Sequence, residues 1–153
     1  MASPNSHSAS ARNVIAKAGL GATPQQERGV RTIDRDTFSA ALWATAAGRA
    51  LLGTLPPAQG LTLLPAEPYP AFTARTKTSW FDLSAAMQAG RRSGIYAEEG
   101  EVDLFLSCYA TPLQQGGRDE KLAVAVSFEA GRPESERRLI RQALQREWRD
   151  FAL

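Results

Sequence analysis

The chain has 153 residues, of which 43% are hydrophobic and 22% charged, with 18 basic against 16 acidic side chains. These proportions fit one folded domain of ordinary size and exclude a chain that is disordered throughout. The single cysteine, Cys108, excludes a disulfide scaffold and is compatible with a reducing compartment.

Residues 1–32 are predicted to form a flexible basic N-terminal arm, and residues 33–153 a single α+β domain. The arm is rich in small and polar residues and is interrupted by several glycines, a composition that buries little apolar surface. Within the arm, Val14, Ile15 and Leu20 form a candidate docking segment that would become ordered on a partner.

A first helix is expected over residues 35–55, because a capping aspartate precedes this segment and two prolines follow it. Ala44 and Gly48 belong to a face of small residues on this helix. Two interpretations fit that face: close packing on a sheet, which is the simpler one, or a dimer interface.

The remaining elements are predicted from apolar alternation, helical spacing and turn residues. In chain order they are strands at 61–64 and 72–78, a helix at 80–89, a tight hairpin of strands at 95–97 and 101–109, a strand at 121–129, and a last helix from residue 133. The order α-β-β-α-β-β-β-α predicts an α+β fold with a mainly antiparallel sheet. This order resembles roadblock/longin-type and profilin-like domains and small type III secretion chaperones. The resemblance implies protein binding, often by dimers.

Side chains suited to catalysis are scarce in the predicted domain. His7 is the only histidine and lies in the arm, so neither a Ser-His-Asp nor a Cys-His site is expected, nor a structural zinc site. Cys108 lies on the apolar face of its strand and is predicted to be a buried core thiol rather than a nucleophile. The sequence therefore predicts no catalytic, cofactor-binding or metal-binding residues, no cofactor, and no enzymatic activity.

Two charged clusters are candidate interaction sites. Glu98, Glu99 and Glu101 are expected at a solvated turn, with a docking face for a basic partner as the next interpretation. Arg75 and Lys77 share one face of a predicted strand near aromatic residues, an arrangement that can hold single-stranded nucleic acid. An ordinary exposed sheet face is the simpler explanation of the second cluster.

The leading hypothesis is a non-enzymatic protein-interaction or assembly subunit: an adaptor, a chaperone-like protein or a structural component of a larger complex. Its partner would be another protein or further copies of this chain. The alternative is a nucleic-acid-associated protein that uses the basic arm and a sheet face. Nucleic acid is disfavoured because residues 36–153 carry thirteen basic and fourteen acidic side chains, which gives no positive excess.

The expected location is the cytoplasm, or a particle that assembles there. The first thirty residues lack the apolar segment of a secretion signal. The longest mildly apolar run, residues 38–55, contains Arg49 and three hydroxyl side chains, whereas a membrane span requires about 20 predominantly apolar residues, so no membrane span is expected.

Overall fold

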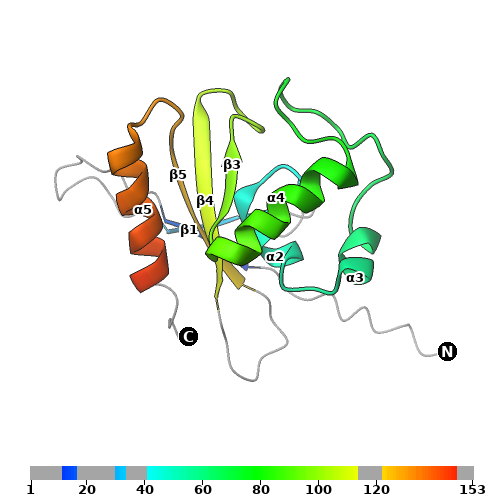
Figure 1. The fold of residues 1–153 in the computed structure, drawn as a ribbon, viewed down its shortest axis with the longest axis horizontal. Helices are drawn as coiled ribbons and strands as arrows, with labels where there is room; N and C mark the ends of the chain where they lie inside the picture. Colours follow the sequence, from blue (N-terminus) through cyan, green and yellow to red (C-terminus); the bar gives the residue numbers. More distant parts are fainter. Residues whose placement is uncertain (1–11, 17–29, 34–40, 114–121, 148–153) are drawn as a thin grey trace.

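The structure, a computed structural model, describes residues 12–16, 30–33, 41–113 and 122–147. It confirms the predicted α+β class. Figure 1 shows a sheet with α5 (Glu134–Glu147) on one side and α2 (Ala46–Leu52) and α4 (Trp80–Ser93) on the other. A further short helix, α3 (Pro57–Thr62), lies between α2 and α4 in the chain. None of the described helices is both long enough and apolar enough to cross a membrane.

The sheet has the spatial order β2-β1-β5-β4-β3. Its strands are β1 (Arg12–Ala16), β2 (Val30–Ile33), β3 (Tyr96–Glu99), β4 (Leu106–Leu113) and β5 (Leu122–Glu129). Neighbouring strands are antiparallel except β1 and β5, which run parallel. The expected mainly antiparallel sheet is therefore confirmed, and β3 forms one of its edges.

The two faces of the sheet carry different side chains. On β4, Cys108 and Ala110 face the α2 side, whereas Tyr109 and Leu113 face the α5 side. Small residues predominate where α2 contacts the sheet, so helix and strands approach closely. Larger aliphatic and aromatic residues fill the space under α5, where Leu144 is fully buried.

Ala44 and Gly48, the small residues predicted for a helix face, are both buried within the domain. A Cβ atom on Gly48 would lie only 2.5 Å from the backbone oxygen of Leu42, so the close approach requires glycine here. The closest contacts of Gly48 are with the turn that precedes α2 and not with the sheet, so they do not decide between the two interpretations of the face. A role of either residue in a dimer interface stays a prediction.

Both strands predicted between the first two helices are wrong. The segment predicted as a strand at 61–64 overlaps α3, which begins at Pro57, where a missing N–H costs little. Residues 72–78 form a bend and a turn followed by an irregular segment, and no strand. The Thr76 hydroxyl accepts hydrogen bonds from N–H groups three and four residues earlier, both at 3.0 Å. These local bonds compete with the hydrogen bonds that a strand would need.

Two helix boundaries also differ from prediction. Within the described residues, only α2 corresponds to the helix expected over 35–55. The residues just before it form turns, and Thr45 caps α2 by accepting from the Gly48 N–H at 3.0 Å. Residues 34–40 lie outside the described part of the chain. Conversely, α4 runs past residue 89 and ends at Ser93, and Gly94 follows it with a left-handed φ of 77°.

The hairpin predicted with a tight turn is more open. β3 and β4 pair as expected, with Glu98 opposite Cys108, but residues 100–105 join them. The Asp103 side chain accepts from the Phe105 N–H at 2.9 Å and shapes this longer connection.

Part of the predicted arm belongs to the sheet. Val14 and Ile15 lie in β1, which pairs with both β2 and β5. Leu20 and His7 lie outside the described residues. The division of the chain at residue 32 and the docking role of the arm stay predictions.

Candidate functional site

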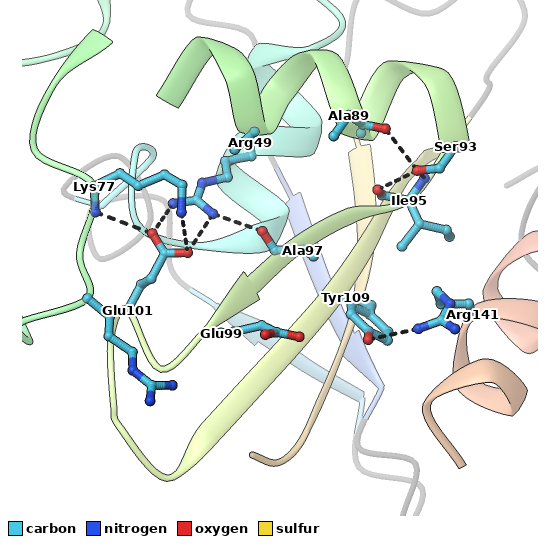
Figure 2. Close-up of a pocket in the computed structure, with 13 residues that line it drawn as sticks. Arg49, Lys77, Ala89, Ser93, Ile95, Ala97, Glu99, Glu101, Tyr109 and Arg141 are labelled. Carbon is cyan, nitrogen blue, oxygen red and sulfur yellow. Dashed lines mark hydrogen bonds and ion pairs between the residues drawn. The ribbon is translucent and has the colours of Figure 1, made fainter. Parts of the chain in front are cut away.

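A cavity of about 660 Å³ lies along the outer edge of β3, between α4 and α5 (Figure 2). Small residues of α4 and β3 line its middle, and charged side chains gather at both sides. Its lining comprises Arg49, Arg75, Lys77, Ala86, Ala89, Gly90, Ser93, Ile95, Ala97, Glu99, Glu101, Tyr109 and Arg141.

The buried side of the cavity is organised by Arg49 of α2. Its guanidinium makes two bonds to the Glu101 carboxylate: Nη2 to Oε1 at 2.5 Å and Nη1 to Oε2 at 2.9 Å. It also donates to the backbone oxygens of Trp43 at 3.0 Å and Ala97 at 2.8 Å. Since Arg49 is 1% exposed, these bonds replace the water that its charge has lost.

Two carbonyl groups near the edge of the sheet are covered by side chains. Arg49 donates to the backbone oxygen of Ala97, and the Ser93 hydroxyl donates to the backbone oxygen of Ile95 at 2.9 Å. An uncovered strand edge invites pairing with another chain. The hydrogen bonds to these two carbonyl groups therefore disfavour the addition of another strand at this edge.

The two buried glutamates have opposite pKa shifts. Burial alone would raise the pKa of Glu101, but the hydrogen bond from Arg49 and the charges of Arg49 and Lys77 outweigh it and lower that pKa. Burial raises the pKa of Glu98, although the N–H groups of Glu101 and Val102 donate to its Oε1 at 2.6 and 3.2 Å. Both carboxylates are thus buried and hydrogen-bonded within the domain, in contrast to the solvated turn expected from the sequence.

The opposite side of the cavity is formed by Tyr109 of β4 and residues of α5. Arg141 Nη1 donates to the Tyr109 hydroxyl oxygen at 3.0 Å, and its other terminal nitrogen pairs with Glu134. Glu99 reaches across to Arg137, with 2.5 Å between Oε1 and Nη1. Polar contacts therefore hold α5 to β3 and β4 at this rim.

The structure brings together Arg75, Lys77, Glu99 and Glu101, which the sequence had assigned to two separate clusters. Glu98 lies beside them but does not line the cavity. Ala44 and Gly48 lie in the core, and Val14 and Ile15 in β1. The roles of these residues in interactions stay predictions.

Sequence reasoning missed Arg49, Tyr109 and Arg141. One signal for Arg49 was available, because it is the only charge within an otherwise apolar helical segment rich in alanine. Such a charge, if the helix is buried, requires a partner of opposite sign. Tyr109 and Arg141 carried no comparable signal.

Cys108 packs at the margin of the α2-side core, and burial raises its pKa to about 12. The Ser127 hydroxyl, 3.7 Å from its sulfur, opposes that shift only partly. A thiol with this pKa stays protonated and is a poor nucleophile near neutral pH. Among the described residues, no three His, Cys, Asp or Glu side chains are grouped so as to hold a metal ion.

Comparison with known proteins gives a family match. The model of the family described as bacterial transcriptional regulator IclR C-terminal matches residues 29–152. No curated protein sequence matches the chain.

Similar solved structures agree with that match. A transcriptional regulator from Rhodococcus sp. RHA1 is 29% identical with a TM-score of 0.58, over 71% of this chain and 43% of that one. The C-terminal domain of the E. coli regulator KdgR is 25% identical with a TM-score of 0.61, over 68% and 64%. The chain thus spans less than two thirds of both.

A third structure shares the fold alone. The inducer-binding domain of the transcription factor PobR from Acinetobacter, in complex with 3-hydroxybenzoic acid, has a TM-score of 0.63 at 17% identity. The match covers 84% of this chain and 77% of that one.

These findings correct the expected function. The leading hypothesis of an assembly or structural subunit is wrong, because the matched family consists of transcriptional regulators. The family also differs from those that the predicted element order resembles. The family consists of regulators and not of enzymes, which agrees with the expectation of no enzymatic activity. For a family of transcriptional regulators, nucleic acid is no longer a disfavoured partner.

Proposed function

Because the chain belongs to the bacterial transcriptional regulator IclR C-terminal family, we propose that it is the regulatory domain of such a regulator and binds a small anionic ligand in the cavity beside β3. The observation that carries this proposal is the cavity itself. Its volume of about 660 Å³ lies within the range typical of small-molecule sites. Four of its lining side chains are cationic and two are acidic.

The positive excess is concentrated on two side chains. Glu101 neutralises Arg49 through two short bonds, whereas Lys77 is 3.4 Å from the same carboxylate and one-third exposed. Arg75 is exposed, and within the described part of the chain its guanidinium has no recorded ion pair or hydrogen bond. Arg75 and Lys77 are therefore available to a ligand, and charge-assisted bonds to an anion are stronger than neutral ones.

A carboxylate on a small apolar body suits the rest of the lining. Ala86, Ala89 and Ala97 give the middle of the cavity an uncharged surface without bulky side chains. The neighbouring fold of the PobR inducer-binding domain was solved with 3-hydroxybenzoic acid, a ligand of this kind. That likeness supports an organic acid as the ligand class for this chain.

Arg75 and Lys77 serve a different partner in this proposal from the one expected from sequence. They line a concave site shared with Glu99 and Glu101, and carboxylates beside the cations oppose contact with a polyanion. DNA is accordingly proposed as a partner of the whole regulator, acting in the cytoplasm, and not of this cavity.

Calorimetric titration of the purified chain with a panel of small organic acids tests the proposal. We expect at least one acid to bind saturably, and Arg75→Gln with Lys77→Gln to weaken binding roughly tenfold or more, as for the loss of a charge-assisted contact. Arg92→Gln is the matched control, since it removes an exposed cation of α4 that does not line the cavity. A chain that binds none of the acids, or equal weakening by Arg92→Gln, would contradict the proposal.

A further inference from the structure

The Tyr109 hydroxyl is a buried polar group on the wall of the cavity. Tyr109 is 4% exposed, and its ring packs against Phe128 with 4.8 Å between ring centroids. The guanidinium of Arg141 lies over the same ring at 5.5 Å and donates to the hydroxyl oxygen. These contacts fix the hydroxyl in place.

The proton of this hydroxyl is unused within the described structure. A phenol can donate one hydrogen bond while it accepts others. Tyr109 accepts from Arg141, and no described residue is recorded as accepting its proton. Because Tyr109 lines the cavity, a ligand oxygen could take this proton.

Arg141 supplies positive charge beside that donor. Its described partners are the Tyr109 hydroxyl and Glu134, whose side chain is 72% exposed. An ion pair so open to water is weak and yields readily to a better-placed anion. The guanidinium has five N–H donors, so it can turn one toward a ligand without releasing Tyr109.

The polar and charged side chains of the cavity form two clusters on its opposite sides. Figure 2 shows Lys77 and Glu101 on one side, Tyr109 and Arg141 on the other, and Ala97 and Glu99 between them. The Glu99 carboxylate is occupied by Arg137, which reduces its repulsion of an anion nearby. The cavity therefore offers two separated places for oxygen anions.

We propose that Tyr109 and Arg141 form a second oxygen-binding subsite, and that the cavity accordingly selects acids with a carboxylate at each end. One carboxylate binds Arg75 and Lys77, and the other accepts from the Tyr109 hydroxyl and Arg141. The inference rests on the proposed function, since it names the ligand class of the same cavity.

Calorimetry with matched acids tests the second subsite. Dicarboxylates from succinate to pimelate are each compared with the monocarboxylate of the same carbon number, so that chain length is controlled. We expect the best dicarboxylate to bind roughly tenfold or more tightly than its partner, as for one added charge-assisted contact.

Variants assign that preference to the two residues. Tyr109→Phe removes only the hydroxyl, and Arg141→Gln removes the charge. Each should weaken the dicarboxylate toward the affinity of its monocarboxylate partner, and Tyr109→Phe should leave the monocarboxylate unchanged. Arg138→Gln is the control, because this exposed cation lies on the same helix outside the cavity.

The outcomes separate the two proposals. Equal binding of every matched pair, or a preference that survives both Tyr109→Phe and Arg141→Gln, overturns the second subsite and leaves the proposed function intact. Failure of every acid to bind overturns both.

Discussion

Two Arg–Glu pairs flank the end of β3. They have the same nitrogen–oxygen distance but differ in their exposure to solvent. Glu101 pairs with Arg49 and Glu99 pairs with Arg137, each with 2.5 Å between nitrogen and oxygen. The side chains of the first pair are 4% and 1% exposed, whereas those of the second are 54% and 15% exposed. Water screens the exposed Glu99–Arg137 pair much more than the buried Glu101–Arg49 pair. Their equal distances therefore say little about their interaction energies.

The buried pair joins segments that are distant in the chain. Arg49 belongs to α2, and its bonds reach the turn at Trp43, the edge strand at Ala97 and the connection at Glu101. The open pair instead fastens α5 to a rim that already has the packing of Phe128 and Ile140 beneath it. We infer that loss of the first pair destabilises the fold more than loss of the second, which lies at the rim of the cavity.

The largest expected effect is that of Arg49→Met. The substitution leaves the Glu101 carboxylate buried beside Lys77 alone and also frees two backbone oxygens, so we expect a loss of about 3–5 kcal/mol of unfolding free energy. Urea unfolding followed by circular dichroism measures it.

A double variant tests whether the cause is the unpaired charge. In Arg49→Met with Glu101→Leu no buried charge is left without its partner, so part of the lost stability should return. An Arg49→Met protein as stable as the wild type would remove the distinction between the two pairs.

Acid titration should separate the two buried glutamates, with a smaller effect than the first variant. The pKa of Glu101 is lowered by Arg49, so its stabilising contribution is present above the unfolded pKa and is lost as pH falls through the folded pKa. The pKa of Glu98 is raised by burial, so its contribution has the opposite sign and is lost as pH rises through the folded pKa.

Isosteric amides give this prediction its measurement. At neutral pH, Glu101→Gln should unfold at lower urea than the wild type, and Glu98→Gln at equal or higher urea. Both differences should shrink as the solution is acidified, because the wild-type carboxyls then become neutral too. Shifts of the same sign at neutral pH would show that one of the two pKa directions is wrong.

The sequence predicted those elements whose signals are local. Ser79 caps α4 as its position before Asp82 indicates, and strict alternation placed Cys108 and Tyr109 on opposite faces of β4. The last helix, predicted from residue 133, begins at Glu134. These features depend on neighbours along the chain, which a sequence displays directly.

The cavity could not be predicted because no local signal encodes it. It forms where α2, the turn around Arg75, α4, the strands β3 and β4, and α5 meet, and none of these contributes more than a few residues. The segment 72–78 illustrates the same limit. Its residues alternate as in a strand, but the Thr76 hydroxyl donates to the backbone oxygen of Glu101, 25 residues away, at 2.5 Å. Long-range bonds of this kind override a local preference for a strand.

The smallest expected effect is that of Glu99→Gln, the open counterpart of Glu101→Gln. Arg137 keeps its place over the Phe128 ring, 5.4 Å from the ring centroid, and its bond to the oxygen of Arg132 at 2.9 Å, so only a screened charge is lost. We expect a loss of about 1 kcal/mol or less, measured by urea unfolding, and a difference from the wild type that diminishes as salt is added. For Glu101→Gln the loss should be larger and less sensitive to salt, because the side chains of Arg49 and Glu101 are only 1% and 4% exposed. If Glu99→Gln were as costly and as insensitive to salt as Glu101→Gln, the rim at α5 would have to be closed to water, and the contrast between the two pairs would fail.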